Sequence, residues 1–321
     1  MKLLDKLEET AMKLVERGKG IFAADAGPET LGKRMAEAGI LDVGPEVRKK
    51  YHEIIFSTPN FSDYISGIIM HDESVIDFIE LIKKNEIMPG VKVDGGLIDT
   101  PNFPGEKITR GLDGLDERLA KYKAMGICFV KWRAVITIGN NLPTKECIQV
   151  NANLLAEYAK KSQNAGLVPI VEPEVIFEEN YDIDLCQSVT KTVGQIVFKT
   201  LEEKQVNLAG IIYKPNMVHP DAKKTVETMK EIVPVQVPGI AFLSGGQDAK
   251  QATFLLNEIV KVGIGAKWNW TFSFERAIEG PAMQTWGGKL ENIEKTQQVL
   301  LHRAKMNSLA SMGLYNQEED L

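Results

Sequence analysis

The sequence predicts an α/β fold, a single (β/α)8 barrel of the TIM type with an N-terminal capping helix and a C-terminal helical extension. Eight short apolar runs recur along its 321 residues, and long amphipathic segments separate most of them. This alternation favours parallel strands joined by right-handed crossovers, and eight strands favour a closed barrel. An open doubly wound sheet is the alternative. It is less favoured because Ala23–Pro28 follows the first strand without a glycine-rich dinucleotide fingerprint.

The predicted elements follow one another along the whole chain. Lys2–Arg17 is amphipathic and charged, which indicates a helix that caps the barrel, and Leu290–Leu309 is predicted to form a long helix after the last strand. The eight predicted strands are Gly20–Ala24, Tyr64–Met70, Ile87–Val93, Ile127–Arg133, Leu167–Glu172, Leu208–Lys214, Gly239–Leu243 and Trp270–Phe274. The amphipathic segments predicted as helices between strands are Leu112–Met125, Ile148–Ala165, Leu185–Glu203, Ala222–Ile232 and Ala249–Lys261.

Residues 1–321 are predicted to form one domain, because no linker-like segment divides the chain. Pro169 lies near the start of its predicted strand, where a proline is tolerated. Residues from about 314 to 321 end in an acidic, polar stretch, so we expect a frayed tail there.

Composition and charge argue against several classes of partner. The chain has 38 Lys and Arg against 44 Asp and Glu, and it has no long basic block, so neither nucleic acid nor a membrane surface is an expected partner. Three widely spaced cysteines without a C-x-x-C pair suit free thiols in a reducing compartment. Without a signal-peptide core or a long apolar span, a cytoplasmic protein is expected. The four histidines lack metal-ligand spacing, so no metal is expected. No cofactor is predicted.

Charged residues stand at the carboxyl ends of the predicted strands. They are Asp25, Lys92, Asp94, Lys131, Arg133, Glu172, Glu174, Lys214 and Arg276. In a parallel barrel these ends share one face, which is where catalytic groups lie. Because side chains alternate along a strand, we expect Lys131 and Arg133 to point inward together, and likewise Glu172 and Glu174. A buried plug of mutually neutralising charges is the structural alternative.

Lys214 is the candidate nucleophile. It ends the apolar run Ala209–Tyr213, and burial disfavours the charged form of a lysine, so a neutral amine is available to attack a carbonyl. Taken alone, such a lysine is more often structural, with its head reaching water. A second cation nearby also lowers a lysine pKa, and Lys131 is the candidate for this effect on Lys214.

Two carboxylates are the predicted proton carriers. Glu172 is expected to act as both acid and base, provided that Glu174 or burial raises its pKa. Asp25 is the second acid–base group, and it is the candidate to take the proton of a hydroxyl when a neighbouring carbon–carbon bond breaks.

Two positive regions predict a substrate with an anionic group at each end. Ser244, Gly245 and Gly246 follow the seventh strand and are expected to enter a helix N-terminus, where backbone N–H groups bind anions. Barrel phosphate sites favour this position, and Arg276 follows the eighth strand. Lys33, Arg34 and Lys92 make the second region, although Lys33 and Arg34 equally suit a solvated helix face.

Seven ordered motifs carry a resemblance to a known family. They are Gly18–Asp25, Gly111–Leu115, Val130–Arg133, Val168–Glu174, Lys214–Val218, Leu243–Gln247 and Trp286–Lys289. With these motifs the chain resembles, along nearly its whole length, the class I fructose-bisphosphate aldolases, a metal-free Schiff-base family with a (β/α)8 barrel.

The resemblance implies roles for the candidate residues and a sugar phosphate as substrate. Lys214 would form the imine with carbon 2, Glu172 would handle carbinolamine dehydration with help from Lys131, and Asp25 would deprotonate the carbon 4 hydroxyl. It also implies that one phosphate is held by Ser244, Gly245, Gly246, Ser273 and Arg276, with Lys33, Arg34 and Lys92 near the other. Glu174 completes the catalytic candidates and Arg133 the substrate-binding ones. A cytoplasmic homotetramer acting in glycolysis is the implied assembly and setting.

The sequence departs from the family pattern at the two phosphate positions. Glu275 stands where the family usually has a glycine whose backbone approaches the phosphate, and a carboxylate there repels an anion. Ala26–Pro28 stands where many relatives carry Glu-Ser-Thr, and Thr30 is the candidate replacement hydroxyl. Two alternatives therefore stay open: a Schiff-base aldolase that prefers fructose 1-phosphate or sedoheptulose bisphosphate, and a non-catalytic barrel scaffold.

Overall fold

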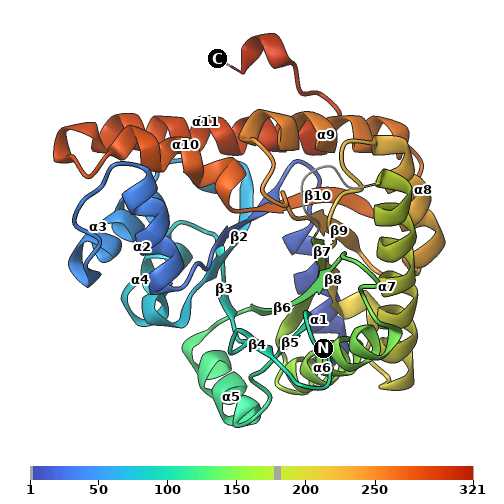
Figure 1. Ribbon diagram of the computed structural model, residues 1–321. Coiled ribbons are helices and arrows are strands. Elements are labelled where there is room, and N and C mark those ends of the chain that lie inside the picture. The colour runs from blue at the N-terminus through green and yellow to red at the C-terminus, as the bar shows by residue number, and fades with distance from the viewer. Residues whose placement is uncertain (1–2, 177–181, 321) are drawn as a thin grey trace.

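Eight parallel strands close into a barrel in the computed structural model, which describes residues 3–176 and 182–320 (Figure 1). Their order is β1-β10-β9-β8-β7-β6-β3-β2, and the closing pair places Ile21 of β1 opposite Ser273 of β10. The strands are β1 (Gly20–Ala24), β2 (Ile65–Met70), β3 (Met88–Lys92), β6 (Phe129–Thr137), β7 (Val168–Ile176), β8 (Ile212–Tyr213), β9 (Gly239–Phe242) and β10 (Asn269–Phe274). The predicted closed barrel is confirmed.

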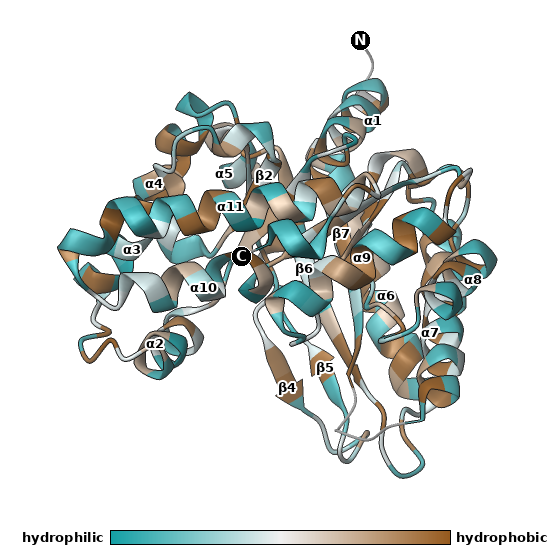
Figure 2. Cartoon of the chain, turned by 90° about the horizontal axis from the view of Figure 1, so that it is seen from above, coloured by the Kyte–Doolittle hydropathy of each residue, from teal (hydrophilic) through white to brown (hydrophobic). Residues whose placement is uncertain are grey.

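Helices surround the barrel, and the predicted ones agree with the structure within a few residues. The helices are α1 (Leu3–Leu14), α2 (Pro28–Glu37), α3 (Pro45–Phe56), α4 (Asp72–Lys84), α5 (Leu115–Met125), α6 (Lys145–Asn164), α7 (Ile183–Glu203), α8 (Ala222–Ile232), α9 (Ala249–Val262), α10 (Arg276–Trp286) and α11 (Ile293–Ser311). Several begin at a side-chain cap, such as Asp221 of α8, which accepts a hydrogen bond from the Lys224 backbone N–H. Polar and apolar residues alternate around them (Figure 2).

Four helices and one hairpin are additions to the predicted elements. The helices are α2, α3, α4 and α10, and the antiparallel hairpin consists of β4 (Leu97–Asp99) and β5 (Lys107–Thr109). A local signal for two of them was present, because α2 and α3 each begin with a proline directly after a glycine. Proline is favoured at the first helical position, where its missing N–H costs nothing.

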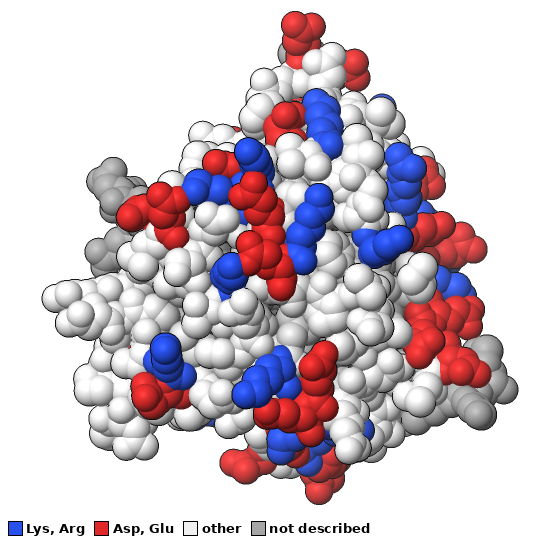
Figure 3. All heavy atoms as spheres, turned by 90° about the vertical axis from the view of Figure 1, so that its right-hand side faces the viewer, with Lys and Arg blue, Asp and Glu red and all other residues white. Residues whose placement is uncertain are grey.

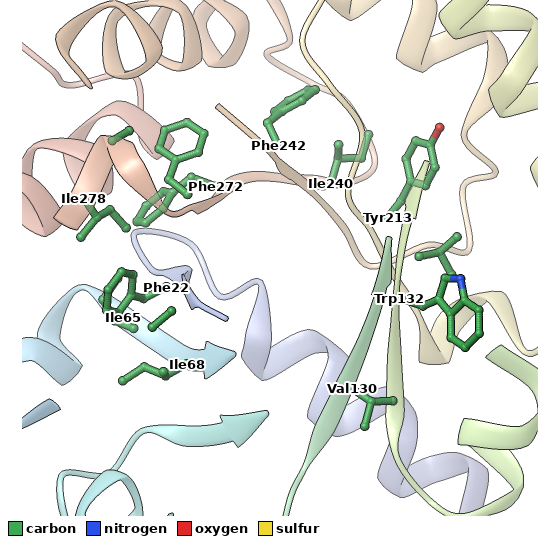
Figure 4. Packing of buried hydrophobic residues seen from close by; sticks show 14 of the residues in the cluster. Phe22, Ile65, Ile68, Val130, Trp132, Tyr213, Ile240, Phe242, Phe272 and Ile278 are labelled. Carbon is green, nitrogen blue, oxygen red and sulfur yellow. The ribbon is translucent and has the colours of Figure 1, made fainter. Parts of the chain in front are cut away.

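The core has two parts, one outside the barrel wall and one inside it. The outer part lies between strands and helices and includes Trp132, whose ring lies 5.4 Å from that of Tyr158 on α6 (Figure 4). The inner part fills the amino end of the barrel. It consists of Leu7, Ala11, Leu14, Val15, Ile21, Ala23, Ile69, Phe129, Val168, Ile170, Ile212 and Ala241. Because four of these belong to α1 and the residue that follows it, the predicted cap helix is confirmed.

Glycines on the strands make room for the inner core. A Cβ atom on Gly90 would lie 2.3 Å from the Phe129 ring, and one on Gly239 would lie 2.6 Å from Val15. Heavy atoms in a packed interior do not approach so closely, so these two strand positions require a residue without a side chain. α1 marks this amino end of the barrel, and the hairpin β4–β5 lies at the opposite end (Figure 2).

Several predictions differ from the structure. The fourth and fifth strands continue to Thr137 and Ile176, so Arg133 and Glu172, predicted as strand ends, lie within β6 and β7. The sixth strand was predicted to span Leu208–Lys214, but Leu208–Gly210 forms a 3-10 turn because the Asn207 side chain accepts a hydrogen bond from the Ala209 N–H. The strand is limited to Ile212–Tyr213, and Lys214 follows it. The frayed tail is wrong for residues 314–320: Asp320 is buried and pairs with buried Arg303 at 2.6 Å, because a buried guanidinium requires an anionic partner. Residue 321 lies outside the described residues.

Charges of both signs lie side by side on the face formed by α7 and α8 (Figure 3). Lys191 pairs with Glu231, and Lys224 pairs with Asp184, which links the two helices. In the described part of the chain, no helix is both long enough and apolar enough to cross a membrane.

Candidate active site

The carboxyl ends of the barrel strands surround a cavity of about 420 Å³. Twelve of the fourteen predicted site residues line it: Asp25, Arg34, Lys92, Lys131, Arg133, Glu172, Glu174, Lys214, Ser244, Gly245, Ser273 and Arg276. Lys33 and Gly246 lie outside the lining. Thr30, the candidate replacement hydroxyl, also faces the cavity. The strand-end rule therefore brings residues from distant parts of the chain to one place.

Glu172 lies between two lysines at the centre of this cavity. Its Oε1 is 3.1 Å from the Nζ of Lys214, and its Oε2 is 3.2 Å from the Nζ of Lys131. Lys131 Nζ also lies 2.5 Å from Asp25 Oδ2. All four side chains are buried, with at most 5% of each residue exposed. Among the described residues, Glu172 Oε2 has the ion pair with Lys131 but no hydrogen bond, so it can still accept one from a ligand.

The two lysines carry opposite pKa shifts. Burial lowers the pKa of Lys214, and the charge of Lys131 adds to this effect, so its pKa lies below the usual lysine value although Glu172 opposes the change. Burial also acts on Lys131, but Asp25 and Glu172 outweigh it, so the pKa of Lys131 is raised. Lys131 therefore stays charged, while Lys214 loses its proton more readily than an ordinary lysine.

The raised pKa that was the condition for Glu172 to act as both acid and base is not found. Burial raises that pKa, but the positive charges of Lys131 and Lys214 outweigh burial, so it lies below its usual value. Glu174 does not raise it, because Glu174 forms an ion pair with Arg133 instead. Asp25 follows the same pattern: burial raises its pKa, and Lys131 and Lys214 lower it by more. Both carboxylates are therefore ready to accept a proton.

The serine and glycine residues after β9 form a loop beside Arg276. Gly245 and Gly246 have φ values of +58° and +84°, a conformation that favours glycine. A Cβ atom on Gly246 would lie 3.0 Å from the Arg276 guanidinium, so Gly246 packs behind that side chain. Ser273 Oγ is buried and has no hydrogen-bond partner among the described residues, which leaves it free for a ligand.

The loop Ser244–Gly246 does not lead directly into a helix N-terminus as predicted. α9 begins at Ala249, and Asp248 caps it by accepting hydrogen bonds from the backbone N–H groups of Lys250 and Gln251. Because the cap already satisfies these donors, the loop residues Ser244 and Gly245 face the cavity in place of the helix end.

The second positive region is smaller than predicted. Lys33 is exposed on α2, whereas the next residue, Arg34, lines the cavity and forms an ion pair with Glu275. Lys92 pairs with Asp94, whose Oδ2 also accepts a hydrogen bond from the Arg133 N–H at 3.2 Å. Lys92 and Arg34 therefore each have an anionic partner. Because Glu275 directly precedes Arg276, Arg34 lies beside the first positive region and not with Lys92 as predicted.

Sequence reasoning missed His71, which also lines the cavity. It directly follows β2 and caps α4, where its Nδ1 accepts a hydrogen bond from the Glu73 N–H at 3.3 Å. Burial and the charge of Lys92 lower the pKa of His71. The signal is the same as for the other residues, a polar side chain that directly follows a strand.

The arrangement provides a reactive amine, two buried carboxylates and an anion-binding loop around one cavity. Among residues 3–176 and 182–320, no group of three or more His, Cys, Asp or Glu side chains is placed to hold a metal ion. A carbonyl compound with an anionic substituent fits these groups, because the amine attacks carbonyl carbon while the carboxylates carry protons.

Comparisons with known proteins agree along the whole chain. A family model described as fructose-bisphosphate aldolase class-I matches residues 6–321. Fructose-bisphosphate aldolase 2 of Caenorhabditis elegans is 42% identical, over 98% of this chain and 91% of that protein. Cytoplasmic isozyme 1 of fructose-bisphosphate aldolase from Pisum sativum is 40% identical, over 98% of this chain and 93% of that protein. The solved structure of fructose-bisphosphate aldolase from Plasmodium falciparum, in complex with TRAP and a small-molecule inhibitor, has a TM-score of 0.95 and 39% identity, covering 98% of this chain and 96% of that one.

Proposed function

Because the chain belongs to the class-I fructose-bisphosphate aldolase family, we propose that its cavity performs the family reaction with Lys214 as the Schiff-base residue. The protein is a carbon–carbon lyase that cleaves fructose 1,6-bisphosphate reversibly to dihydroxyacetone phosphate and glyceraldehyde 3-phosphate, in glycolysis and gluconeogenesis. The observation that carries the residue assignment is the opposite pKa shift of two buried lysines that share one carboxylate.

Schiff-base formation is the first step. The neutral amine of Lys214 adds to carbon 2 of the ketose, and Glu172 moves a proton from the attacking nitrogen to the carbonyl oxygen. Glu172 then takes a proton from solvent and passes it to the carbinolamine hydroxyl, which departs as water and leaves an iminium. The lowered pKa of Glu172 suits the start of this sequence, because a carboxylate must first accept the proton. Lys131 stays charged and holds both Glu172 and Asp25 in place.

Cleavage of the carbon–carbon bond is the second step. Asp25 takes the proton of the carbon 4 hydroxyl, the bond between carbons 3 and 4 breaks, and its electron pair moves into an enamine on Lys214. The aldehyde product leaves, and the enamine is protonated at carbon 3 before water releases the second product. Asp25 has the lowered pKa of a group that is ionised before the reaction starts, which supports its role as base.

The anionic ends of the substrate are assigned to the two positive regions. One phosphate is proposed to bind Ser244, Gly245, Ser273 and Arg276, with Gly246 supporting the Arg276 guanidinium. Lys92, with Arg133 and Glu174 nearby, lies toward the other end, and Thr30 supplies a hydroxyl. Arg34 belongs to the cavity, whereas the exposed Lys33 is left without a direct role.

Borohydride trapping tests the assignment of Lys214. Incubation with fructose 1,6-bisphosphate and borohydride is expected to reduce the imine and add the mass of the sugar phosphate to Lys214, which peptide mass spectrometry locates. The Lys33→Met protein is the matched control, because it removes an exposed lysine outside the cavity and is expected to retain trapping on Lys214. Trapping on any other lysine, or no trapping at all, would contradict the proposed site.

Three further properties belong to the same proposal. We propose that residues 1–321 form one domain, that the protein is cytoplasmic like the isozyme named so in Pisum sativum, and that it assembles as a homotetramer. Analytical ultracentrifugation measures the assembly directly: a mass near four times 35.6 kDa is expected, and a monomeric mass contradicts the tetramer.

A further inference from the structure

Glu275 is an acidic residue inside the anion-binding end of the cavity. It stands between Ser273 and Arg276 in the chain, and all three line the cavity. Its side chain is 25% exposed, and its Oε1 forms an ion pair with Nη1 of Arg34, which is 22% exposed. A partly buried charge pair is screened less than a surface pair, so this contact affects any anion that binds beside it.

Glu279 lies one helical turn further along α10, behind the same guanidinium. Its Oε1 is 3.9 Å from Arg34 Nη1, and its Oε2 is 3.4 Å from the hydroxyl of Tyr51 on α3. Burial and the neighbouring charge of Glu275 raise the pKa of Glu279 to about 8, although Arg34 opposes this change. Near pH 7 Glu279 is therefore mostly uncharged, which leaves Glu275 as the carboxylate that neutralises Arg34.

The charges at this end of the cavity decide how strongly it attracts a phosphate. Arg34 and Arg276 supply two positive charges, and Glu275 removes one of them by pairing with Arg34. A phosphate that reaches Ser273 and Arg276 also approaches the Glu275 carboxylate, which repels it unless Arg34 is shared between the two anions. The pair is thus a local neutral unit, and Arg276 beside it has no ion-pair partner within residues 3–176 and 182–320.

We propose that Glu275 is a specificity-determining residue that holds Arg34 away from the substrate phosphate and so weakens phosphate binding at this end of the cavity. The inference deepens the proposed function and rests on it, since it names a residue that sets substrate preference at the same site. The difference in affinity between a ketose with a phosphate at this end and one without it is then smaller than it would be if both Arg34 and Arg276 bound the phosphate.

Binding of inorganic phosphate to the resting protein is the direct test, because it needs no turnover. Glu275→Gln keeps the shape of the side chain and removes its charge, so Arg34 becomes available, and phosphorus NMR titration is expected to show about tenfold tighter binding. Glu37→Gln is the matched control: it removes one exposed carboxylate from α2, one turn from Arg34 and outside the cavity, and is expected to leave the affinity unchanged. Unchanged or weaker binding in Glu275→Gln overturns the inference.

A double variant separates the pairing of Arg34 from simple repulsion. Replacing both partners, with Arg34→Gln and Glu275→Gln together, removes a neutral unit, so phosphate affinity is expected to stay within about twofold of the unmodified protein. Binding that is tenfold tighter in the double variant means that Glu275 acts by repulsion alone, and binding that is tenfold weaker means that Arg34 already holds phosphate beside Glu275. Either result overturns the inference. Glu275→Ala, expected to bind tighter as well, provides a second variant if Glu275→Gln does not fold.

Kinetics show whether the same residue sets substrate preference. In Glu275→Gln the KM for fructose 1,6-bisphosphate is expected to fall by about tenfold, with a smaller change in kcat, because the substitution affects binding of a remote phosphate more than the chemical step. Comparing fructose 1-phosphate with fructose 6-phosphate identifies which phosphate binds at this end, because KM is expected to fall only for the sugar that carries that phosphate. An equal fall in KM for both sugars, or no fall for either, contradicts the inference. Absence of a borohydride adduct on Lys214 would refute the proposed function while leaving the phosphate affinities as an independent result.

Discussion

The two ends of the barrel interior differ in what fills them, although the same strands build both. On β6 Phe129 belongs to the apolar layer and Lys131 to the charged cavity, and Ile170 with Glu172 on β7 repeat this spacing. Ile212 and Lys214 do so once more at β8. Side chains two residues apart on a strand point to the same face, so both members of each pair point into the barrel. In each pair the first residue packs in the apolar layer and the second lines the charged cavity.

The difference shows how a barrel combines stability with reactive groups. Apolar residues at the amino end gain free energy by leaving water, at about 25 cal/mol per Å². The buried charges at the carboxyl end lose their hydration, and Asp25, Lys131, Glu172 and Lys214 each have a partner of opposite sign within a few ångströms. The amino end is therefore expected to set stability, and the carboxyl end to set activity and its pH dependence.

The largest expected effect comes from Lys214→Met. It removes the only amine proposed to form the imine, so cleavage activity is expected to fall at least about ten-thousandfold. The thermal midpoint is not expected to fall, because a buried lysine is replaced by an apolar side chain and Glu172 keeps Lys131 as its partner. A steady-state cleavage assay and scanning calorimetry measure the two quantities. A clear loss of thermal stability would mean that the charged end also holds the fold together.

Phe129→Ala is the converse change at the amino end. It leaves a cavity where the ring packs against Gly67 and Gly90, so the free energy of unfolding is expected to fall by about 3–5 kcal/mol. Urea titration measures this value, with Ile264→Ala as control, because Ile264 is 81% exposed and its truncation is expected to change little. Loss of less than about 1 kcal/mol in Phe129→Ala would break the assignment of stability to this layer.

The pH dependence of stability separates the two ends further. Glu279 has a pKa raised from 4.5 to about 8, so the folded protein keeps a proton that the unfolded chain loses. Stability is then expected to fall by a few kcal/mol as pH rises from about 4.5 to about 8, since each pKa unit corresponds to about 1.4 kcal/mol. Glu279→Gln should flatten this slope, whereas Phe129→Ala should lower stability equally at both ends of the range. Urea titrations at pH 5 and pH 8 compare the variants, and an unchanged slope in Glu279→Gln contradicts the buried titration.

The smallest expected effect is a displaced pH profile in Lys131→Met. The charge of Lys131 lowers the pKa of Lys214, and its loss also leaves Glu172 to pair with Lys214 alone, so both consequences raise the pKa of Lys214. The pH at which borohydride trapping reaches half its maximum is expected to move upward. Lys131→Arg keeps the charge and is expected to move it less. A downward displacement would mean that Lys131 does not lower the pKa of Lys214.

Neighbouring residues show where sequence reasoning reached its limit. Lys33 and Arg34 were indistinguishable as adjacent cations, but successive residues on a helix point about 100° apart, so Arg34 enters the cavity while Lys33 stays in solvent. The position of α2 on the barrel decides which of them does so. Glu172 and Glu174 lie on the same face of one strand, but their ion pairs differ. Glu174 pairs with Arg133, whereas Glu172 pairs with two lysines.

The sequence by itself determined the closed barrel, the capping helix and the gathering of charged residues at one end of the strands. These follow from local periodicity, because side-chain direction repeats every two residues along a strand and every 3.6 along a helix. Only the tertiary structure decided which charges pair and which group titrates where: the lowered pKa of Glu172, the pairing of Arg34 with Glu275 and the buried proton of Glu279. Electrostatic energies depend on separations of a few ångströms and on burial, and both are set by residues far apart in the chain.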